Sequence, residues 1–313
     1  MKIADFCGQD TGGQSWNLVQ AINEYTSHEA HQFRQARDYL DFPVEFQAPL
    51  SGKMLEAASN FLSQVDVVHC HNRYRYTKNF GPINKKAKWV IHQHGRFGQG
   101  QFPQVKKDDI ARGALRIVST LNLVKYSDIW FPAPIDPRKF DGLKNRYFNK
   151  NRKIIKIAHS PTNRGYKHTE LLIEVVRQLK EEGLPIVLIL VENRSHAECL
   201  RLKADCDITF DQMYLGYGNS GLEGMAFGQA TICGCQDKKN LYSFGSIVKK
   251  YVGYIPYVPC YPAVLKDILK KLILHPELRQ THGLLGRKYI EEFHSSPVAA
   301  KRAIKLYEKV LSA

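Results

Sequence analysis

The sequence lacks any long apolar run. No apolar stretch approaches the ~20 consecutive residues that a membrane-spanning helix needs. The first residues, Met1 to Phe6, have the pattern of a buried strand and lack the basic and apolar regions of a signal peptide. We therefore expect a soluble, cytoplasmic protein, with the inner face of a membrane as a candidate peripheral location.

Cysteines are few and are not arranged for metal binding or disulfides. The chain has seven of them, an odd number, and no pair has the CxxC spacing of a zinc site. Cys233 and Cys235 flank Gly234 at the end of an apolar run. This usage predicts buried free thiols in a reducing compartment.

Acidic residues are scarce relative to basic ones. The chain has 30 Asp and Glu against 45 Lys and Arg, which gives a formal net charge of +15. Such an excess predicts an anionic partner, either nucleic acid or an anionic membrane surface. Solvated surface lysines without a partner are an equally good interpretation, because charge alone identifies no ligand.

Length and patterning predict two α/β domains. The 313 residues, 43% of them hydrophobic, exceed most single domains. Apolar runs typical of buried strands alternate with segments of helical periodicity, which predicts parallel sheets. The expected strands are 3–7, 30–33, 66–71, 89–93, 115–120, 129–131, 154–159, 186–190, 208–210 and 230–233; the expected helices include 15–22, 55–62, 170–181, 196–203, 263–274 and 297–311. A basic, proline-flanked stretch at 138–152 predicts a linker, so we expect domains at 1–150 and 151–296, followed by a helix at 297–313 that packs back toward the first domain.

A glycine-rich turn from Asp211 to Gly228 is the most informative stretch. It joins an apolar strand to an apolar helix start, with glycines at 216, 218 and 221. The N-terminus of such a helix presents backbone N–H groups and favours an anion such as a phosphate. Glu223 lies one turn into this helix, where a carboxylate can bind a ligand hydroxyl.

Histidines follow two predicted strands. His69 and His71 end one apolar run, and His92 and His94 end another. Ligands of open α/β sheets bind at the carboxyl ends of strands, so we expect hydrogen bonds to a substrate, with a structural role as the alternative. No neighbouring carboxylate in the sequence completes a ligand set, so we expect no metal.

Two further loops are candidates. Gly12 and Gly13 precede a helix, although the Gly-x-Gly-x-x-Gly pattern is absent and a plain connection explains them as well. Basic and aromatic residues alternate from Arg73 through Arg75 to Phe80. Arginines can hold phosphates while tyrosines stack on bases or sugars. An exposed loop that packs on its own domain is the alternative.

Three groups of residues together resemble a known family. The run Gly221–Gly228 is close to a glutamate-(Gly/Ala)-Met-Ala-x-Gly motif. Lys167 lies in the strand-loop-helix of 157–172, just before the helix. Gly12–Gly13 precedes a helix, and His94–Gly95 follows a strand. In this the chain resembles the nucleotide-sugar glycosyltransferases of the GT-B fold, specifically family 4. The resemblance covers about residues 8 to 295.

The resemblance implies an α/β protein with two Rossmann-like domains whose parallel sheets face each other across a cleft. It implies a hexosyltransferase-like enzyme that takes its sugar from a UDP- or GDP-sugar, retains the anomeric configuration, and needs no metal and no cofactor. The first domain would take the acceptor and the second the nucleotide sugar. Basic side chains and helix amides would neutralise the leaving diphosphate.

The site residues follow from the same resemblance. Glu223 would contact the ribose, and Lys167 with the backbone of 219–222 would hold the diphosphate. The sequence departs from the family pattern at Leu215, where a second glutamate is usual, and at Thr162, where an arginine is usual. The expected catalytic residues are His94, Lys167 and Arg164; the expected donor-binding residues are Gly12, Gly13, Asp211, Gln212, Asn219, Ser220, Gly221, Leu222 and Glu223; and the acceptor-side candidates are His71, Arg73 and Arg75.

The acceptor has two candidate classes. An envelope glycan or lipid fits the family and the positive charge, and modified bases of DNA or RNA fit the charge about as well. A non-catalytic sugar-nucleotide or nucleic-acid binding protein is a third hypothesis. A nucleotide-sugar epimerase is the rival within the fold, and it would require carboxylates beside the substrate.

Overall fold

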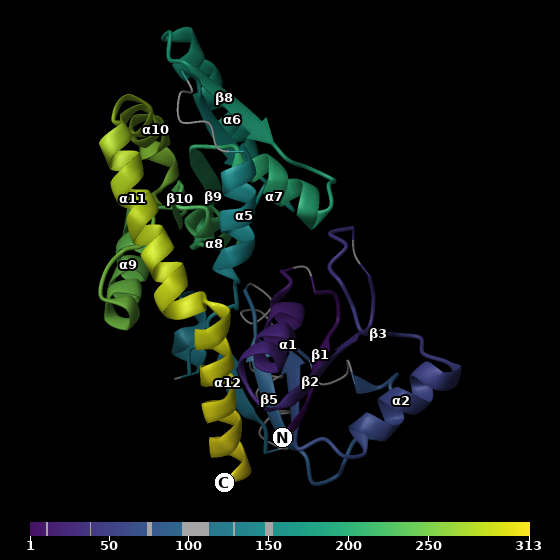
Figure 1. Ribbon diagram of the computed structural model, residues 1–313. Coiled ribbons are helices and arrows are strands. Elements are labelled where there is room, and N and C mark those ends of the chain that lie inside the picture. The colour runs from purple at the N-terminus through teal and green to yellow at the C-terminus, as the bar shows by residue number, and fades with distance from the viewer. Residues whose placement is uncertain (11, 38, 74–76, 96–112, 128, 148–152) are drawn as a thin grey trace. The chain divides into compact units, whose positions relative to one another are not determined.

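The computed structural model describes residues 1–10, 12–37, 39–73, 77–95, 113–127, 129–147 and 153–313 (Figure 1). Its contacts divide the chain into two compact units, Met1–Pro134 with His294–Ala313, and Ile135–Phe293. Each unit contains one sheet of parallel strands, so the predicted α/β class with two Rossmann-like domains is confirmed. Within the described residues, no helix has both the length and the apolar character that crossing a membrane demands.

The first unit is built on a six-stranded sheet in the order β3-β2-β1-β4-β5-β6. Its strands are β1 (Lys2–Cys7), β2 (Glu29–Arg34), β3 (Phe46–Gln47), β4 (Val67–His71), β5 (Lys88–Gln93) and β6 (Leu115–Val118). Its helices are α1 (Gln14–Tyr25), α2 (Gly52–Leu62), the 3-10 helix η2 (Leu121–Tyr126) and α12 (Ser296–Leu311). Helices cover both faces of this parallel sheet, so side chains on both sides of the strands are buried. This explains why the strand sequences are continuous apolar runs.

Side-chain alternation gives the first sheet two different faces. Ile3 and Val67 join a core with α1 and α12, and the next residues, Ala4 and Val68, join a second core with α2. Tyr307 of α12 is fully buried in the first of these cores, and α12 lies beside α1 (Figure 1). Because alternation has a period of two, the odd-numbered residues that follow on β1 and β4 also point toward α1.

The second unit has a five-stranded parallel sheet in the order β11-β10-β9-β7-β8. The strands are β7 (Ile155–His159), β8 (Ile186–Leu190), β9 (Ile208–Gly216), β10 (Ala230–Cys235) and β11 (Val258–Cys260). The helices are α5 (Pro137–Tyr147), α6 (Thr169–Glu181), α7 (His196–Ala204), α8 (Asn219–Ala226), α9 (Lys238–Val252), α10 (Leu265–Leu274) and α11 (Pro276–Tyr289), with short 3-10 and π segments at Pro262–Val264 and Ile290–His294. The apolar faces of α6 and α10 pack on one core with β7, β9 and β10.

Three local predictions are wrong. The stretch expected to be a linker contains α5, because Phe140 is buried against Phe227 and anchors the helix. The strand expected to end at Phe210 continues to Gly216, because β10 supplies hydrogen-bonding partners along that length. The strand expected at 129–131 is reduced to a bridge between Val118 and Trp130.

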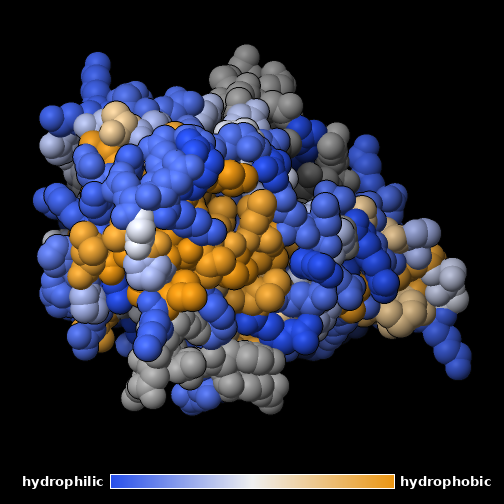
Figure 2. Space-filling view, turned by 90° about the horizontal axis from the view of Figure 1, so that it is seen from above, coloured by the Kyte–Doolittle hydropathy of each residue, from blue (hydrophilic) through white to orange (hydrophobic). Residues whose placement is uncertain are grey.

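The surface is mixed in character. Figure 2 shows one face on which a patch of apolar residues is bordered by hydrophilic ones. Exposed apolar residues are normal on folded proteins, and this patch alone identifies no partner.

Candidate functional site

The first candidate site lies at the start of α8, where β9 turns into the helix. We call Lys167, Asp211, Gly218, Ser220 and Glu223 the α8 site. Lys167 comes from the loop after β7, and the other members come from β9, the turn and α8. The strands β7 and β9 are neighbours, so their carboxyl ends bring these loops together.

Lys167 and Asp211 form an ion pair at this turn. The Lys167 Nζ lies 2.5 Å from the Asp211 Oδ1, and the backbone N–H of Gly218 donates to the Asp211 Oδ2 at 2.5 Å. Asp211 is fully buried, whereas 15% of the Lys167 side chain is exposed. Within the described part of the chain, Asp211 is the one hydrogen-bond acceptor found for Lys167, and an ammonium group carries three donors. The lysine is therefore fixed in place with donors left for an anion.

The turn is also closely packed. A Cβ at Gly221 would lie 2.8 Å from the Asp211 Oδ2, and a Cβ at Gly218 would lie 3.5 Å from the Lys167 Nζ. The Gln212 Nε2 is 3.6 Å from that same point at Gly218. The structure thus brings Lys167, Asp211 and Gln212 to the glycines of the turn.

Glu223 is held by two basic side chains. The Nζ of Lys203 lies 2.7 Å from one carboxylate oxygen, and the Nε2 of His196 lies 2.8 Å from the other. Burial alone would raise the pKa of Glu223, but Lys203 and His196 lower it to about 2. Glu223 is therefore ionised at neutral pH.

Lys203 is a functional-site candidate that the sequence analysis missed. Its side chain is completely buried and donates to the backbone oxygen of Ser220 at 2.9 Å, to the Ser220 hydroxyl at 3.0 Å and to Glu223. Burial lowers the pKa of Lys203, but Glu223 outweighs burial, so the pKa stands above its ordinary value. Nothing in the run His196–Ala204 distinguishes this lysine from a surface one, so no sequence signal identified it.

The other predicted residues of the second unit lie in different settings. The Ser220 hydroxyl also meets the Ser160 hydroxyl at 2.9 Å, whereas the Leu222 side chain is buried in the core. Arg164 is exposed and is paired with Glu170 and Glu192. The α8 site therefore contains three of the nine residues predicted to bind the donor, Asp211, Ser220 and Glu223, and Arg164 is engaged by carboxylates at the surface.

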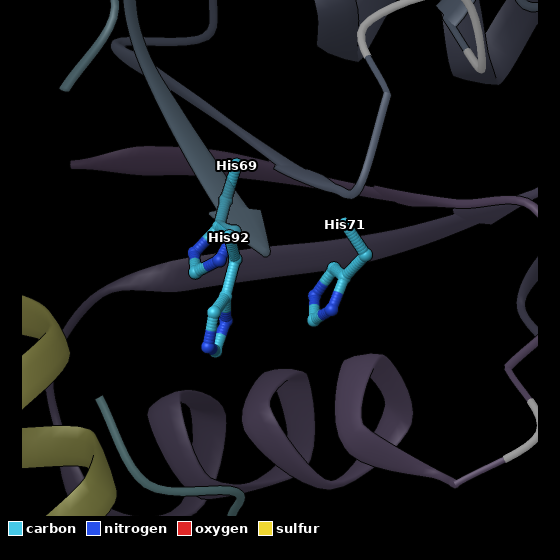
Figure 3. A group of neighbouring side chains, drawn as sticks. All are labelled: His69, His71 and His92. Atoms are coloured by element: carbon cyan, nitrogen blue, oxygen red, sulfur yellow. The ribbon is translucent and has the colours of Figure 1, made fainter. Parts of the chain in front are cut away.

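The second candidate site is a histidine cluster in the first unit. His69 and His71 on β4 and His92 on β5 project from the same face of the sheet toward α1 (Figure 3). Asp5 lies on the same face of β1, in register with His69, and His94 follows directly after β5. Asp5, His69 and His92 are each at most 1% exposed. The predicted histidines are brought together, and a carboxylate that the sequence analysis did not assign lies among them.

Hydrogen bonds connect three of these side chains with one another and with Ser119, which directly follows β6. The Asp5 carboxylate lies 3.0 Å from the His71 Nε2, the His71 Nδ1 lies 2.6 Å from the His94 Nε2, and the His94 Nδ1 lies 2.9 Å from the Ser119 Oγ. Burial lowers the pKa of His71, but Asp5 and Asp10 raise it above its ordinary value. The pKa of His94 is well below its ordinary value because the ring is desolvated and lies beside His71.

Within the described residues, His69 and His92 have one hydrogen-bond partner each. The His69 Nδ1 meets the Tyr307 hydroxyl at 2.6 Å, and the His92 Nε2 donates to the backbone oxygen of Phe131 at 3.2 Å. The remaining nitrogens of these two rings are buried without a partner within the described residues. Burial lowers the pKa of His69 to about 3, so the ring is neutral.

His69, His71 and His92 form a candidate metal site. One nitrogen each from His69, His71 and His92 lies within 4.8 Å of the others (Figure 3). Both nitrogens of His71 are engaged, however, by Asp5 and by His94. Two open imidazole nitrogens are fewer than the three protein ligands that a catalytic zinc site uses. The arrangement is better suited to moving a proton than to holding a cation.

The turn before α1 is closed by a buried carboxylate. Asp10 accepts hydrogen bonds from the backbone N–H groups of Ser15 at 3.2 Å and Trp16 at 2.9 Å, and from the Gln32 side chain at 3.0 Å. Gly13 has φ 62°, and a Cβ there would lie 2.3 Å from the Phe42 ring. The donors at this helix N-terminus are thus satisfied by the protein's own anion, and Gly13 is required by packing.

Asp10 gives a testable prediction. Burial raises its pKa above the ordinary value, so the stabilisation from protonation is present below that ordinary value and is lost as pH rises through the folded-state pKa. We expect Asp10→Asn to lose less stability at pH 7 than Asp10→Ala, because one amide oxygen still accepts from the α1 backbone and no charge is buried. Asp10→Ala should lose about 1 kcal/mol through the missing cap. Urea unfolding of both variants at pH 7 measures this, and equal losses in the two would contradict it.

The remaining acceptor-side candidates are only partly described. The backbone N–H of Arg73 donates to the backbone oxygen of His71 at 2.9 Å, which fixes the chain directly after β4. Arg75 lies outside the described residues. The proposed basic and aromatic loop therefore stays a prediction.

Comparison with known proteins bears on the fold. No family model matches the chain, and the curated proteins contain no significant match. Among solved structures, HepE from Anabaena, determined with UDP and glucose, matches with a TM-score of 0.68 at 13% identity over 98% of this chain and 99% of that one. The fold is of the GT-B type.

Two further structures show the same similarity. MnaA of S. aureus, determined with UDP, has a TM-score of 0.53 at 12% identity over 100% of this chain and 98% of its own. The glycosyltransferase SnogD from Streptomyces nogalater has a TM-score of 0.51 at 12% identity over 98% and 100%. At these identities the likeness establishes the GT-B architecture, and the assignment to family 4 stays a prediction.

Proposed function

We propose that this protein is a glycosyltransferase that moves a sugar from a nucleotide-sugar donor to an acceptor. The observation that carries the proposal is the α8 site. There, a helix N-terminus lies beside Lys167, which its ion pair with Asp211 holds at the carboxyl ends of β7 and β9 and which has donors left for an anion. This is where α/β sheets bind phosphorylated ligands. That HepE and MnaA, which share the fold, were determined with UDP supports a UDP-sugar in particular.

The residues of the α8 site have separate roles in this proposal. Lys167 and the backbone of Asn219–Leu222 bind the diphosphate, and Lys167 stabilises the charge that develops on it as the sugar leaves. Glu223, fixed by Lys203 and His196, accepts a hydrogen bond from a ribose hydroxyl through a remaining lone pair. Asp211 and Gln212 position the donor sugar in place of the carboxylate that Leu215 does not provide.

The finer features of the reaction rest on the resemblance. We propose hexosyl transfer with retention of configuration and without a metal, with Lys167 and Arg164 in the role that a divalent cation would otherwise have. For Arg164 to take this role, its ion pairs with Glu170 and Glu192 must first break. His94 and the turn at Gly12 and Gly13 belong to the part of the reaction carried by the first unit.

The class of acceptor is proposed from the net charge of the protein. The net charge of +15 favours an anionic membrane face that carries a glycan or lipid acceptor, with the protein peripheral on its cytoplasmic side. Modified bases of DNA or RNA are the alternative acceptor, with Arg73 and Arg75 on phosphates. Binding to duplex DNA and to anionic vesicles across a salt series distinguishes these two classes.

A second candidate function has one observation in its favour. An epimerase acting on the sugar of a nucleotide sugar needs carboxylates for acid–base chemistry, and Asp5 and Asp10 lie beside His71 in the first unit. Both carboxylates are engaged by protein donors, Asp5 by Ser15 and His71 and Asp10 by the α1 backbone. We therefore propose glycosyl transfer, ahead of epimerisation, as the function of this protein.

Incubation with a panel of UDP- and GDP-sugars tests the proposal. We expect release of the nucleoside diphosphate, fastest for one donor, and a product that carries the sugar on an acceptor. A nucleotide sugar with an altered sugar and no released diphosphate would indicate the epimerase. Binding without any turnover would indicate a non-catalytic protein and contradict the proposal.

A further inference from the structure

We propose that the exposed side of α9 is a docking surface for an anionic membrane. The choice of partner rests on the proposed function, whose acceptor is carried by an anionic membrane face, and the surface itself is drawn from the second unit alone. The helix spans Lys238–Val252 and packs on β10 and β11 at one end of the second sheet (Figure 1). Phe244, Val248 and Val252 form its buried side.

The opposite side of α9 is basic along its whole length. Four lysines, a tyrosine and a serine are exposed there, and the helix contains no Asp or Glu. With about 3.6 residues per turn, these six side chains fall within an arc of about 120°, and the outermost two are separated by about 18 Å along the helix. We call this set the α9 face: Lys238, Lys239, Tyr242, Ser246, Lys249 and Lys250.

The lysines of the α9 face have no carboxylate beside them to neutralise their charge. Within the described residues, none of the four forms an ion pair, whereas Lys266 and Lys270 on α10 are both paired with Glu182. Asp237, which precedes the helix, is engaged as its N-cap. The α9 face therefore presents four positive charges to an external anionic partner.

The residue types favour lipid headgroups over a nucleic acid. All four cations are lysines, whose compact charge needs no fixed geometry, whereas recognition of nucleic-acid phosphates favours the fork of arginine. Tyr242 is 66% exposed, and tyrosines are enriched where a membrane meets water. The Lys238 Nζ lies 5.8 Å from the centroid of the Tyr242 ring, so a cation and an aromatic ring are presented together. This combination suits the charged and partly apolar layer of a membrane surface.

A second basic stripe in the chain is weaker. On α12, Lys301, Lys305 and Lys309 recur every four residues and are exposed. Glu308 is exposed too, and its spacing of three from Lys305 places it on the same side of the helix. Three lysines and one glutamate give this stripe a charge of +2, whereas the four lysines of the α9 face give +4. We therefore expect α9 to direct membrane binding.

Co-sedimentation of the whole chain with lipid vesicles tests the inference. We expect binding to phosphatidylcholine vesicles that contain phosphatidylglycerol, little binding to phosphatidylcholine alone, and a decrease in binding as salt is added. Each lysine near an anionic membrane contributes about a factor of five to partitioning. Replacing all four lysines of the α9 face by glutamine should therefore weaken binding about 10²–10³-fold.

The control variant removes four lysines elsewhere. It combines Lys271→Gln on α10 with Lys301→Gln, Lys305→Gln and Lys309→Gln on α12, all exposed positions, and so has the same net charge as the α9 variant. It should bind vesicles much more tightly than the α9 variant does. Equal binding by the two variants would overturn the inference, because net charge alone would then account for it. Binding of the wild type to duplex DNA but not to anionic vesicles would overturn it as well.

Failure of this inference is distinguishable from failure of the proposed function. Release of the nucleoside diphosphate from a nucleotide sugar is measured without vesicles, and the α9 variant should keep the wild-type rate. A wild type that turns over its donor but ignores anionic vesicles overturns the α9 surface alone. A protein that binds vesicles through α9 but turns over no nucleotide sugar overturns the proposed function, while the docking surface stands.

Discussion

Replacing Glu223 by alanine is expected to lower the free energy of unfolding by about 3–5 kcal/mol, because it leaves the Lys203 ammonium buried without its counter-ion. Lys203 is completely buried, and the Ser220 oxygens are neutral acceptors that do not replace a charge. Chemical denaturation at pH 7 measures the loss. A double variant that removes both charges, Lys203→Met with Glu223→Leu, should recover most of it, because no unpaired charge is then buried.

The control for this prediction is a carboxylate of the same type at the surface. Glu182 is paired with Lys266 and Lys270, and its side chain is 34% exposed. Glu182→Ala should change stability little, because water screens an exposed pair. A loss in Glu223→Ala no larger than that in Glu182→Ala would show that the buried pair does not stabilise the second unit.

The same pair predicts a dependence on pH. The pKa of Glu223 is lowered to about 2, so its contribution is present above the ordinary value of 4.5 and is lost as pH falls toward 2. The pKa of Lys203 is raised, so its contribution is present below the ordinary value of 10.5 and is lost as pH rises through the higher folded-state value. The stability difference between wild type and the double variant should therefore be constant near neutral pH and decrease in acid.

Replacing Lys167 by alanine is expected to lower turnover by about 10²–10³, because the leaving diphosphate loses its positioned cation. The change also leaves the Asp211 carboxylate buried, with the Gly218 N–H as its donor within the described residues, so a loss of stability should accompany it. Steady-state kinetics with the preferred nucleotide sugar, together with denaturation, measures both effects.

A second substitution separates the two effects. Lys167→Ala combined with Asp211→Asn removes the buried charge, so stability should return while turnover stays low. Lys270→Ala, which removes a positive charge at the surface, serves as the control and should keep wild-type turnover. If the double variant regained both stability and turnover, Lys167 would be a structural residue only.

Much of the fold follows from local patterning. Strands such as Ile186–Leu190 are apolar and short, and helices such as Thr169–Glu181 have an apolar face, so each type is determined by neighbouring residues. The extent of β9 is not determined in this way. The glycines at 216, 218 and 221 indicate a loop, whereas pairing with β10 keeps the residues up to Leu215 in the strand. The helix α5 was missed because its basic composition outweighed the apolar anchor Phe140.

The residues of the candidate sites were predictable where they lie in short sequence motifs. Lys167 and Glu223 lie in short motifs with glycine turns, and the histidines follow strands, so the expected positions could be assigned. Lys203 and Asp5 could not be assigned, because neither belongs to a sequence motif and each is an isolated position in an ordinary helix or strand. Lys203 and Ser220 are 17 residues apart in the sequence, and only the fold of the chain brings them within hydrogen-bond distance.

Calorimetric titration with UDP, GDP and the corresponding nucleosides tests the central claim most directly. If the α8 site holds the diphosphate, one nucleoside diphosphate should bind saturably and its nucleoside much more weakly, and Lys167→Ala with Asp211→Asn should lose affinity for the diphosphate but not for the nucleoside. Absence of binding by both nucleotides, or an affinity for the diphosphate that this variant leaves unchanged, would contradict the claim.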